Sequence, residues 1–458
     1  MEQGTMRASV IGLGKLGSPL AACLAAKGLQ VVGVDADAHK VEAINQGHAP
    51  VFEPQLEDMV RASEGRLRAT SSIAEAVQAS EITFIVVATP SEPNGDFSLR
   101  FALPVCEEIG HALAAKESYH VVVLTSTVMP GTTGGVVRDV LERASGKRLG
   151  PDFGLCYGPE FIALGSVVRD FLNPDFVLIG ESDARAGEQL ESIYHRVCEN
   201  SPGVARMSFV NAELAKLSVN SYVTTKISFA NMLARICERL PGSDVDVVTR
   251  ALGLDTRIGG KYLKGAVSYG GPCFPRDNLA LLALAKQLGV PADLAQATNH
   301  FNRAQIPWLA DLACGQLSSR GTIGVLGLTY KPNTDVVEEA VGLLLAQELA
   351  RRGCSVLAYD PTGKLNSVRA LGEAAHFALS ADECISASDV IVLATPWPEF
   401  VGIPASRWAR VGAPRVVVDC WRALPHLADA YGVLYMGLGL GHNVASCHEE
   451  STRGRAAR

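Results

Sequence analysis

The sequence predicts an α/β protein with two Rossmann-like doubly wound domains, joined by a long central helix and a helical domain. Three observations predict this fold: a glycine-rich turn between a strand and a helix, a repeat of the same strand pattern near the C-terminus, and a helical stretch between the two. We expect an NAD-binding domain at 1–205, a central helical domain at 206–305, a second Rossmann-like domain at 306–445 and a disordered polar tail at 446–458.

The glycine-rich turn lies in "ASVIGLGKLGSPL", where an apolar strand from Ala8 leads into a GxGxxG pattern. A helix over 18–27, a second strand over 30–34 and then Asp35 follow. The glycines let the backbone approach a pyrophosphate, and the helix N-terminus supplies free N–H groups. A carboxylate at Asp35 accepts hydrogen bonds from the adenosine ribose and repels a 2′-phosphate. The pattern therefore predicts NAD rather than NADP.

Two further apolar strands end in hydroxyl side chains. "EITFIVVATP" ends at Thr89-Pro90, and "HVVVLTSTVMPG" ends at Ser126-Thr127. Ligands of open parallel sheets bind beyond the carboxyl ends of the strands, so these hydroxyls are candidate cofactor contacts. Ordinary turn residues are the alternative.

The repeat begins near Thr322. "SASDVIVLATPWPEF" mirrors "QASEITFIVVATPSEP", and "PRVVVDCWRAL" mirrors "YHVVVLTSTVM". The second half lacks a full GxGxxG, which favours a different nucleotide from the one bound by the first half. Between the halves, a helix is predicted over 211–240, and a helix in this position is a candidate dimerisation element.

Composition narrows the function classes. The chain has 458 residues, a net charge of −7 and 48% apolar residues, with no basic stripe and no apolar run long enough for a membrane span. We therefore expect a cytoplasmic protein without nucleic-acid or membrane partners. The eleven cysteines include no CxxC pair, so we expect no metal site, and most thiols should be reduced core residues.

Cys273 is the exception, because it lies in "YGGPCFPRDN". Glycine and proline on both sides predict a fixed irregular loop rather than helix or strand. Asp277 follows closely and precedes an apparent helix, so it is either the N-cap of that helix or a partner of the thiol, and the two roles are compatible.

Three other polar side chains are candidates. Lys216 and Asn220 are four apart on the predicted long helix and share a face, as either a site or a solvated stripe. Glu160 follows a predicted strand end and a Gly-Pro turn, and a solvated turn residue is its alternative.

The chain resembles the UDP-glucose/GDP-mannose dehydrogenase family over nearly its full length. The motifs that carry the resemblance are "GLGKLG", "TSTVMPG", "GPEFIALG", "AELAKLSVNSY", "DTRIGGKYLKGAVSYGGPCFPRD", "GLTYKPNTD" and "ATPWPEF". The resemblance implies an NAD-dependent four-electron oxidation that turns the C6 hydroxymethyl of a nucleotide-linked hexose into a carboxylate. UDP-glucose is the expected substrate, and UDP-N-acetylhexosamine and GDP-mannose are alternatives. It also implies a homodimer or a larger homo-oligomer.

The resemblance assigns roles to individual residues. Cys273 corresponds to the nucleophile that forms a thiohemiacetal and then a thioester, and Lys216 to the lysine that stabilises the oxyanion. Asn220 corresponds to the lysine's hydrogen-bonding partner, and Asp277 to a carboxylate that helps to activate water. Thr127 and Glu160 correspond to residues that order this water, with Glu160 also a candidate general base.

Binding residues follow in the same way. The expected cofactor contacts are Gly12, Gly14, Lys15, Leu16, Gly17, Asp35, Lys40, Thr89, Pro90, Thr127 and Arg276. The expected substrate contacts are Glu160, Phe161, Ile162, Ala163, Leu164, Lys216, Asn220, Arg257, Tyr262, Leu263, Lys264, Tyr269, Gly270, Gly271, Phe274, Lys331 and Arg422. Arg257 corresponds to an arginine that crosses the dimer, Lys331 to a diphosphate contact, and the glycines before Cys273 are expected to let substrate approach closely.

The chain departs from the family pattern at several positions. Leu164 stands where many members have a glutamate, and Glu338 where many have an arginine, which suggests a coupled change at the cofactor edge. "GKLG" replaces "GYVG", and "DCWR" replaces the usual Gly-Arg that supports the role of Arg422. Two other functions are alternatives. A two-electron hydroxyacid dehydrogenase needs neither the cysteine nor the second nucleotide-binding half, and a catalytically silent NAD-binding protein does not need the Cys273, Lys216, Asn220 and Asp277 set.

Overall fold

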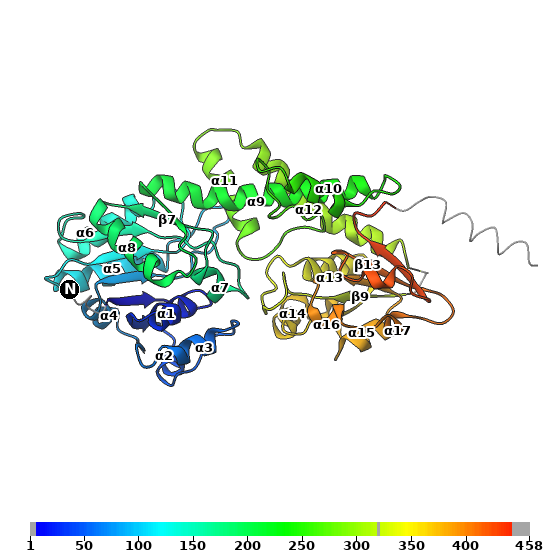
Figure 1. The fold of residues 1–458 in the computed structure, drawn as a ribbon, viewed down its shortest axis with the longest axis horizontal. Helices are drawn as coiled ribbons and strands as arrows, with labels where there is room; N and C mark the ends of the chain where they lie inside the picture. Colours follow the sequence, from blue (N-terminus) through cyan, green and yellow to red (C-terminus); the bar gives the residue numbers. More distant parts are fainter. Residues whose placement is uncertain (1–5, 318–320, 442–458) are drawn as a thin grey trace, which may run out of the picture. The chain divides into compact units, whose positions relative to one another are not determined.

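The computed structural model describes residues 6–317 and 321–441, so the predicted tail at 446–458 lies outside the described residues. The chain divides into two compact units, residues 1–219 and 220–458. Each unit contains one sheet (Figure 1).

The sheet of the first unit has eight strands in the order β3-β2-β1-β4-β5-β6-β7-β8. The strands are β1 (Arg7–Ile11), β2 (Gln30–Val34), β3 (Leu67–Thr70), β4 (Ile82–Ile85), β5 (Val121–Leu124), β6 (Gly154–Tyr157), β7 (Phe176–Glu181) and β8 (Gly203–Met207). The first six follow the Rossmann order, and the chain reverses direction once, because β7 is antiparallel to β6.

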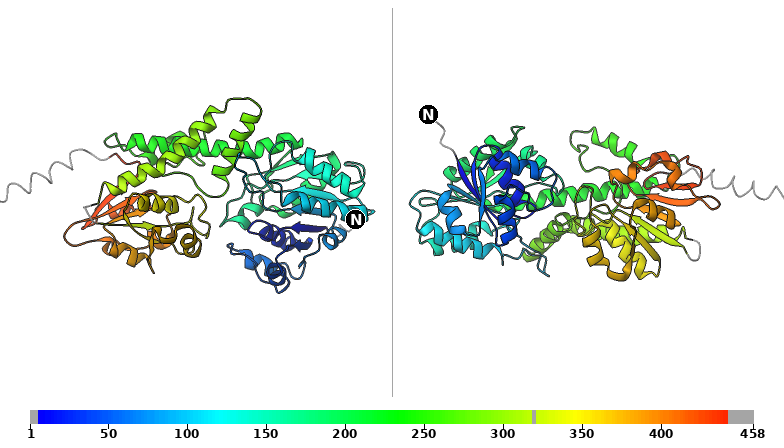
Figure 2. Two further views of the ribbon diagram at one scale, coloured as in Figure 1. Left: turned by 180° about the vertical axis from the view of Figure 1, so that it is seen from behind. Right: turned by 90° about the horizontal axis from the view of Figure 1, so that it is seen from below.

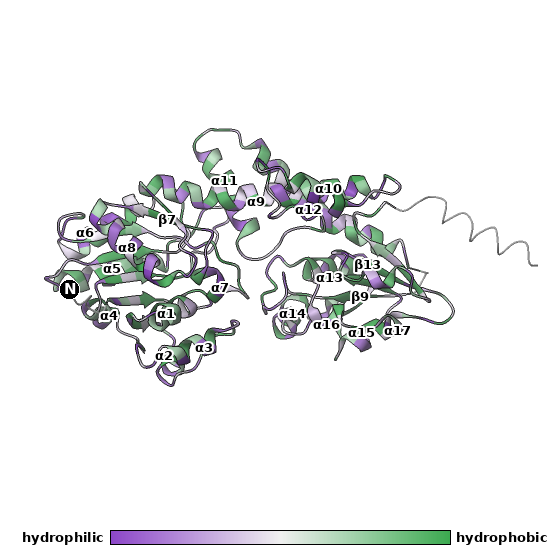
Figure 3. Cartoon of the chain, in the orientation of Figure 1, coloured by the Kyte–Doolittle hydropathy of each residue, from purple (hydrophilic) through white to green (hydrophobic). Residues whose placement is uncertain are grey.

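Helices cover both faces of this sheet, and each face has its own hydrophobic core. One core includes α1 (Gly17–Ala26), α3 (Leu56–Ala62), α7 (Val167–Leu172) and α8 (Ala184–Val197); the other includes α4 (Ile73–Ala79), α5 (Ala102–Ala114) and α6 (Arg138–Ser145). The strands are short and apolar with both faces buried, as in "VVVL" of β5, which is typical of a parallel sheet between helical layers (Figure 3).

The sheet of the second unit has six parallel strands in the order β11-β10-β9-β12-β13-β14. The strands are β9 (Thr322–Leu326), β10 (Ser355–Tyr359), β11 (His376–Phe377), β12 (Val390–Leu393), β13 (Arg415–Asp419) and β14 (Val433–Gly437). Its helices are α13 (Val341–Arg351), α14 (Lys364–Leu371), α15 (Ala381–Ala387), α16 (Pro398–Val401) and α17 (Ala405–Trp408). The order is again that of a Rossmann fold, so the predicted fold class is confirmed.

Among the described residues, four helices lie between β8 and β9 in the sequence: α9 (Phe209–Cys237), α10 (Val245–Gly253), α11 (Phe274–Gln287) and α12 (Asp293–Cys314). The helix predicted over 211–240 is therefore α9, whose 29 residues continue from the first unit into the second. Figure 2 shows the ribbon, with this long helix, from two further directions. Among the described residues, no helix combines the length and apolarity needed to cross a membrane.

Candidate active site

The backbone of the glycine turn in the first unit is tightly folded at Gly12 and Gly17, and the space beside Gly14 is open. Gly12 has a φ of +100°, and a Cβ at Gly17 would come 1.8 Å from the carbonyl oxygen of Gly12, so a side chain at Gly17 would prevent this turn. At Gly14, a Cβ would meet nothing within 4 Å. No side chain caps the N-terminus of α1. The turn therefore offers backbone N–H groups and open space, as a pyrophosphate requires.

Asp35 follows β2 and lies beside this turn. Its carboxylate accepts hydrogen bonds from the N–H of Leu13 at 2.7 Å and of Asp37 at 2.9 Å, and Lys40 Nζ lies 3.2 Å away. The side chain is 12% exposed, so part of the carboxylate still faces solvent. These groups fit an adenosine ribose beside the turn, and bound NAD would supply the acceptor for a hydride.

The remaining residues expected to contact the cofactor lie in the glycine turn, after β4 and in the second unit. Lys15 and Leu16 lie in the turn itself, immediately before α1. Thr89 is buried after β4, and its hydroxyl donates to the carbonyl of Thr127 at 2.7 Å, so the two predicted strand ends are joined. Pro90 follows it and is partly exposed. Arg276 belongs to the second unit, where its Nε donates to Asp277 at 3.2 Å.

Glu160 and Lys216 lie together in the first unit. Lys216 Nζ donates to the carbonyl oxygen of Glu160 at 2.5 Å and lies 4.4 Å from the ring centre of Phe161. Tyr194 of α8 donates its hydroxyl to Glu160 Oε1 at 2.8 Å. The backbone of the "GPEF" turn thus orients the lysine, while a buried tyrosine orients the carboxylate.

Burial raises the pKa of Glu160 to about 7, although the Tyr194 hydroxyl and the charge of Lys216 both act to lower it. A carboxyl group with a pKa near neutrality exchanges protons readily at physiological pH, which is the property required of a general base. Ile162, Ala163 and Leu164 continue the same turn and are partly or fully exposed.

Two buried carboxylates that the sequence did not reveal fix the neighbouring loops. Glu213 of α9 accepts from the N–H of Gly131 at 2.6 Å and of Thr133 at 2.7 Å, which holds the "TSTVMPG" loop that contains Thr127. Glu53 accepts from Gly165 and Val167, both at 2.9 Å, and so holds the end of the "GPEFIALG" loop. Partners so far apart in sequence leave no local pattern to recognise.

Cys273 immediately precedes α11 in the second unit. The prediction of an irregular loop on both sides of the thiol is wrong on its C-terminal side, because Phe274 and Pro275 begin the helix. Proline is favoured in the first turn of a helix, where its missing N–H costs nothing. A helix N-terminus stabilises negative charge, so this position favours a thiolate. Among the ten cysteines that the structure describes, only Cys273 is exposed.

Asp277 lies one turn into the same helix. The prediction that it is the N-cap is therefore wrong: Cys273 occupies that position, and its carbonyl accepts from the Asp277 N–H at 2.8 Å. The Asp277 carboxylate is fully buried and accepts from Asn220 Nδ2 at 2.6 Å. Asn220 and Lys216 are one turn apart on α9, as predicted from their spacing.

Aromatic rings surround the start of α11. The Phe274 ring packs edge-on against Tyr262, at 6.0 Å between centroids, and against Tyr269, at 6.3 Å. Tyr262 has a φ of +63° and is half exposed, whereas Tyr269 is buried. Three of the expected substrate-binding residues thus form one cluster beside the thiol.

Gly270 and Gly271 are needed for packing within the protein. A Cβ at Gly270 would lie 2.0 Å from the carbonyl oxygen of Glu339, and one at Gly271 would lie 2.6 Å from the ring of Tyr330. The chain itself thus comes close to both glycines, and a close approach of substrate at them stays a prediction. This packing brings the "GLTYKPNTD" loop, including Lys331 beside Tyr330, against the segment before Cys273.

Arg422 is engaged within the second unit. It is 6% exposed, pairs with both oxygens of Asp246 at 2.7 and 2.9 Å, and donates to the carbonyls of Leu438 and Gly265, both at 2.6 Å. It therefore holds the backbone at Gly265 and Leu438 in place, and direct contact of Arg422 with a nucleotide stays a prediction.

The other expected substrate residues of this unit differ in their surroundings. Lys264 lies close enough to Asp246 to help lower the pKa of that carboxyl, an effect in which Arg422 has the larger part. Leu263 is buried beside it. Arg257 is highly exposed and pairs with Asp255 at 2.6 Å, so a reach across a dimer stays a prediction for it. No cluster of three or more metal-ligating side chains occurs among the described residues.

Two Rossmann folds, an open glycine turn followed by an aspartate and an exposed cysteine at a helix N-terminus define a dinucleotide-dependent oxidoreductase. Sequence comparison matches the NAD-binding, central and UDP-binding domains of the UDP-glucose/GDP-mannose dehydrogenase family to residues 6–198, 210–304 and 324–426. The chain belongs to this family, whose members are nucleotide-sugar 6-dehydrogenases that use NAD.

Individual relatives have different substrates in their names. The chain is 37% identical to UDP-glucose 6-dehydrogenase AglM of Haloferax volcanii, over 87% of this chain and 93% of that protein. It is 36% identical to GDP-mannose 6-dehydrogenase of Pseudomonas savastanoi pv. phaseolicola, over 78% and 81%. A solved UDP-glucose dehydrogenase from Pyrobaculum islandicum is 34% identical and superimposes with a TM-score of 0.87 over 96% of this chain and all of that chain. The fold and the NAD dependence are thereby established, and the sugar is not.

Proposed function

We propose that this protein oxidises C6 of UDP-glucose from an alcohol to a carboxylate, with Cys273 as the nucleophile. The observation that carries the proposal is the exposed thiol at the start of α11, one helical turn from the buried Asp277–Asn220 pair. A dehydrogenase that only made an aldehyde or a ketone would have no use for such a thiol.

The proposed reaction has two hydride transfers. The first leaves an aldehyde, to which the Cys273 thiolate adds. The thiohemiacetal loses a second hydride and becomes a thioester, and water cleaves the C–S bond and supplies the second carboxylate oxygen. Each hydride requires one NAD, so one sugar consumes two NAD and one water.

The polar groups of each unit have a role in this proposal. Lys216, held by the Glu160 carbonyl, supplies positive charge to the oxyanion. Glu160 accepts the proton of the attacking water, which its raised pKa suits. Asp277 and Asn220 form a fixed hydrogen-bonded pair near the thiol, where the carboxylate orients the water.

A uridine nucleotide is favoured because the family domain matched at residues 324–426 is a UDP-binding domain. GDP-mannose is a second candidate, because relatives with that substrate in their names are almost as similar as the UDP-glucose relatives. The test is NADH formation with a panel of UDP-glucose, UDP-N-acetylhexosamines and GDP-mannose. The highest kcat/KM should belong to UDP-glucose, and a higher value for GDP-mannose would overturn the proposed substrate.

We also propose that the chain forms a homodimer through α9. Tyr222, Phe229 and Ile236 are spaced by seven residues, so they lie on one side of the helix, and they are 63%, 46% and 47% exposed. A stripe of large exposed apolar side chains on a helix suits a second copy of the same surface. Light scattering should give the mass of a dimer, and Phe229→Glu should reduce it, whereas a monomeric parent chain would contradict the proposal.

A further inference from the structure

The later part of the segment between α10 and α11 is largely buried although it has no helix or strand. Its residues Leu263, Ala266, Val267, Ser268 and Tyr269 are all less than 9% exposed. A buried backbone without regular structure must find hydrogen-bond partners for its N–H and C=O groups among side chains or other loops. The partners of residues 264–271, which we term the substrate loop, therefore determine how firmly that loop is held.

Asn231 of α9 supplies the first pair of partners. Its side chain is 1% exposed. The amide Nδ2 donates to the carbonyl of Val267 at 2.5 Å, and Oδ1 accepts from the N–H of Ala266 at 2.7 Å. One side chain thus satisfies the backbone on both sides of a single peptide bond of the loop.

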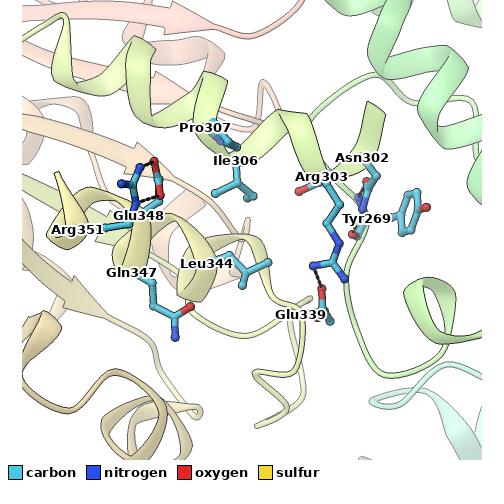
Figure 4. Close-up of a pocket in the computed structure, with 11 residues that line it drawn as sticks. Tyr269, Asn302, Arg303, Ile306, Pro307, Glu339, Leu344, Gln347, Glu348 and Arg351 are labelled. Atoms are coloured by element: carbon cyan, nitrogen blue, oxygen red, sulfur yellow. Dashed lines mark hydrogen bonds and ion pairs between the residues drawn. The ribbon is translucent and has the colours of Figure 1, made fainter. Parts of the chain in front are cut away.

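Asn302 of α12 supplies the second pair. It is 6% exposed, Oδ1 accepts from the N–H of Tyr269 at 2.9 Å, and Nδ2 donates to the carbonyl of the same residue at 3.0 Å. Figure 4 shows Asn302 directed at Tyr269, with Arg303 bonded to Glu339 beside them. This reciprocal pairing is the one that a neighbouring β-strand would make.

Asparagine suits this task because its amide carries both a donor and an acceptor in a fixed plane. Aspartate in its ionised form offers acceptors only, and alanine offers neither. Packing alone does not hold Tyr269 here, since the Asn302–Tyr269 contact forms a wall of a cavity of about 310 Å³. Without close packing on that side, the two hydrogen bonds define the position of the backbone.

The loop is continuous with the nucleophile. Two residues after Tyr269, the N–H of Gly271 donates to the carbonyl of Glu338 at 3.1 Å. Cys273 follows as the N-cap residue of α11. Three residues separate Tyr269 from Cys273, so we expect a shift of the backbone at Tyr269 to move the thiol.

We propose that Asn231 and Asn302 are positioning residues that clamp the substrate loop and so fix the sugar-binding backbone and the Cys273 thiol. Their catalytic effect rests on the function proposed above, whereas the clamp itself does not. Neither residue touches the reacting atoms in this account; both act through the loop.

Amide hydrogen exchange on the full-length protein, without substrate, tests the clamp directly. In Asn302→Ala, the Tyr269 amide should lose protection by roughly tenfold or more, because a buried N–H has lost its acceptor. The Ala266 amide should keep its protection, since Asn231 is unchanged. Asn231→Ala should give the opposite pattern. Asn302→Asp keeps an acceptor for the Tyr269 N–H and should keep most of its protection.

Asn45 offers a matched control. Its amide makes the same reciprocal pair with Ala69 in the first unit, with Nδ2 to the carbonyl at 3.0 Å and the N–H to Oδ1 at 2.7 Å. Asn45→Ala should leave the exchange of the substrate loop and the turnover of the sugar unchanged. Unaltered protection of Tyr269 in Asn302→Ala would overturn the clamp, and so would a loss spread evenly over the whole second unit.

Steady-state kinetics then connect the clamp to catalysis. Asn302→Ala should lower kcat by about ten- to a hundredfold through misplacement of the reacting groups and raise KM for the sugar, with KM for NAD unchanged. Unchanged kcat and sugar KM would overturn the positioning role. If the parent protein oxidised no nucleotide sugar, the proposed function would fail, and the exchange result would still decide the clamp.

Discussion

The two Rossmann-like sheets share a turn geometry but use the aspartate after their second strand differently. A Cβ at Gly17 would lie 1.8 Å from the Gly12 carbonyl oxygen, and one at Gly342 would lie 1.8 Å from that of Gly327. Both folds therefore join the first strand to its helix by the same close backbone contact. The chain between the paired glycines differs, because the second turn contains the inserted "LTYKPNTD" segment with Lys331.

The aspartates differ in how many partners they have inside the protein. Asp35 keeps part of its carboxylate exposed. Asp360 is 3% exposed and accepts from the N–H groups of Leu328 at 2.7 Å, Thr329 at 2.9 Å, Thr362 at 3.0 Å and Gly363 at 2.7 Å, and from the Thr329 hydroxyl at 2.9 Å. The Asp35 carboxylate can still bind a ribose, whereas the Asp360 carboxylate holds the inserted turn through its hydrogen bonds. The same scaffold thus yields an NAD site in one half and a differently organised nucleotide site in the other.

The largest expected effect is the loss of uronate formation on substitution of Cys273 in the second unit. NAD binding by the first unit should not change. Cys273→Ser should reduce uronate formation by three orders of magnitude or more, roughly the loss seen when a covalent nucleophile is removed. NAD affinity, measured by fluorescence titration, should be unchanged because the glycine turn and Asp35 are intact. A variant that makes uronate at the parent rate would show that the thioester route is wrong.

Alanine substitutions at the two aspartates should differ in stability. Asp360→Ala leaves several buried N–H groups without an acceptor and should lower the free energy of unfolding of its domain by about 3 kcal/mol or more. Asp35→Ala should cost about 1 kcal/mol, since water can replace part of its carboxylate. Denaturant unfolding without ligand gives both values, and equal losses would contradict the contrast between the two turns.

For cofactor affinity, Asp35→Ala should have a larger effect than Asp360→Ala. Asp35→Ala removes the charged acceptor for the ribose and should weaken NAD binding about ten- to a hundredfold, while improving NADP relative to NAD. Asp35→Glu is the companion variant that keeps the charge. Calorimetric titration with both cofactors checks the result, and an unaltered preference for NAD would remove Asp35 from the cofactor site.

The smallest expected effect concerns the proton chemistry of the first unit. The Tyr194 hydroxyl stabilises the carboxylate form of Glu160, so Tyr194→Phe should raise the pKa of Glu160 further above its usual range. If Glu160 is the base, activity lost on acidification should begin at a higher pH, by about one pH unit or less. Tyr119→Phe, at a tyrosine just before β5 in the same unit, is the control. Coincident pH profiles for parent and Tyr194→Phe would exclude this role for Glu160.

The sequence was informative where chemistry and local geometry coincide. The glycine turn followed by Asp35, and the repeat of strand patterns, predicted both Rossmann folds, since each signal lies within a short stretch of chain. The exposure of Cys273 agrees with its selection as the candidate nucleophile among eleven cysteines. The sequence does not show the start of α11, because proline disrupts the interior of a helix but is favoured in its first turn.

The supporting residues could not be predicted. Tyr194 is 34 residues from Glu160, Glu213 is 82 residues from Gly131, and Asn302 is 33 residues from Tyr269. Each is an ordinary polar residue within a helix until the fold places it against a loop. Only the three-dimensional structure identifies such contacts, since neither periodicity nor spacing records them.

The number of NADH molecules formed per UDP-glucose consumed tests the central claim most directly, because it counts the hydride transfers. With limiting UDP-glucose and excess NAD, absorbance at the end of the reaction and mass analysis of the product should give two NADH per sugar and UDP-glucuronate. One NADH per sugar, with an aldehyde or ketone as the product, would contradict an oxidation that proceeds through a thioester on Cys273.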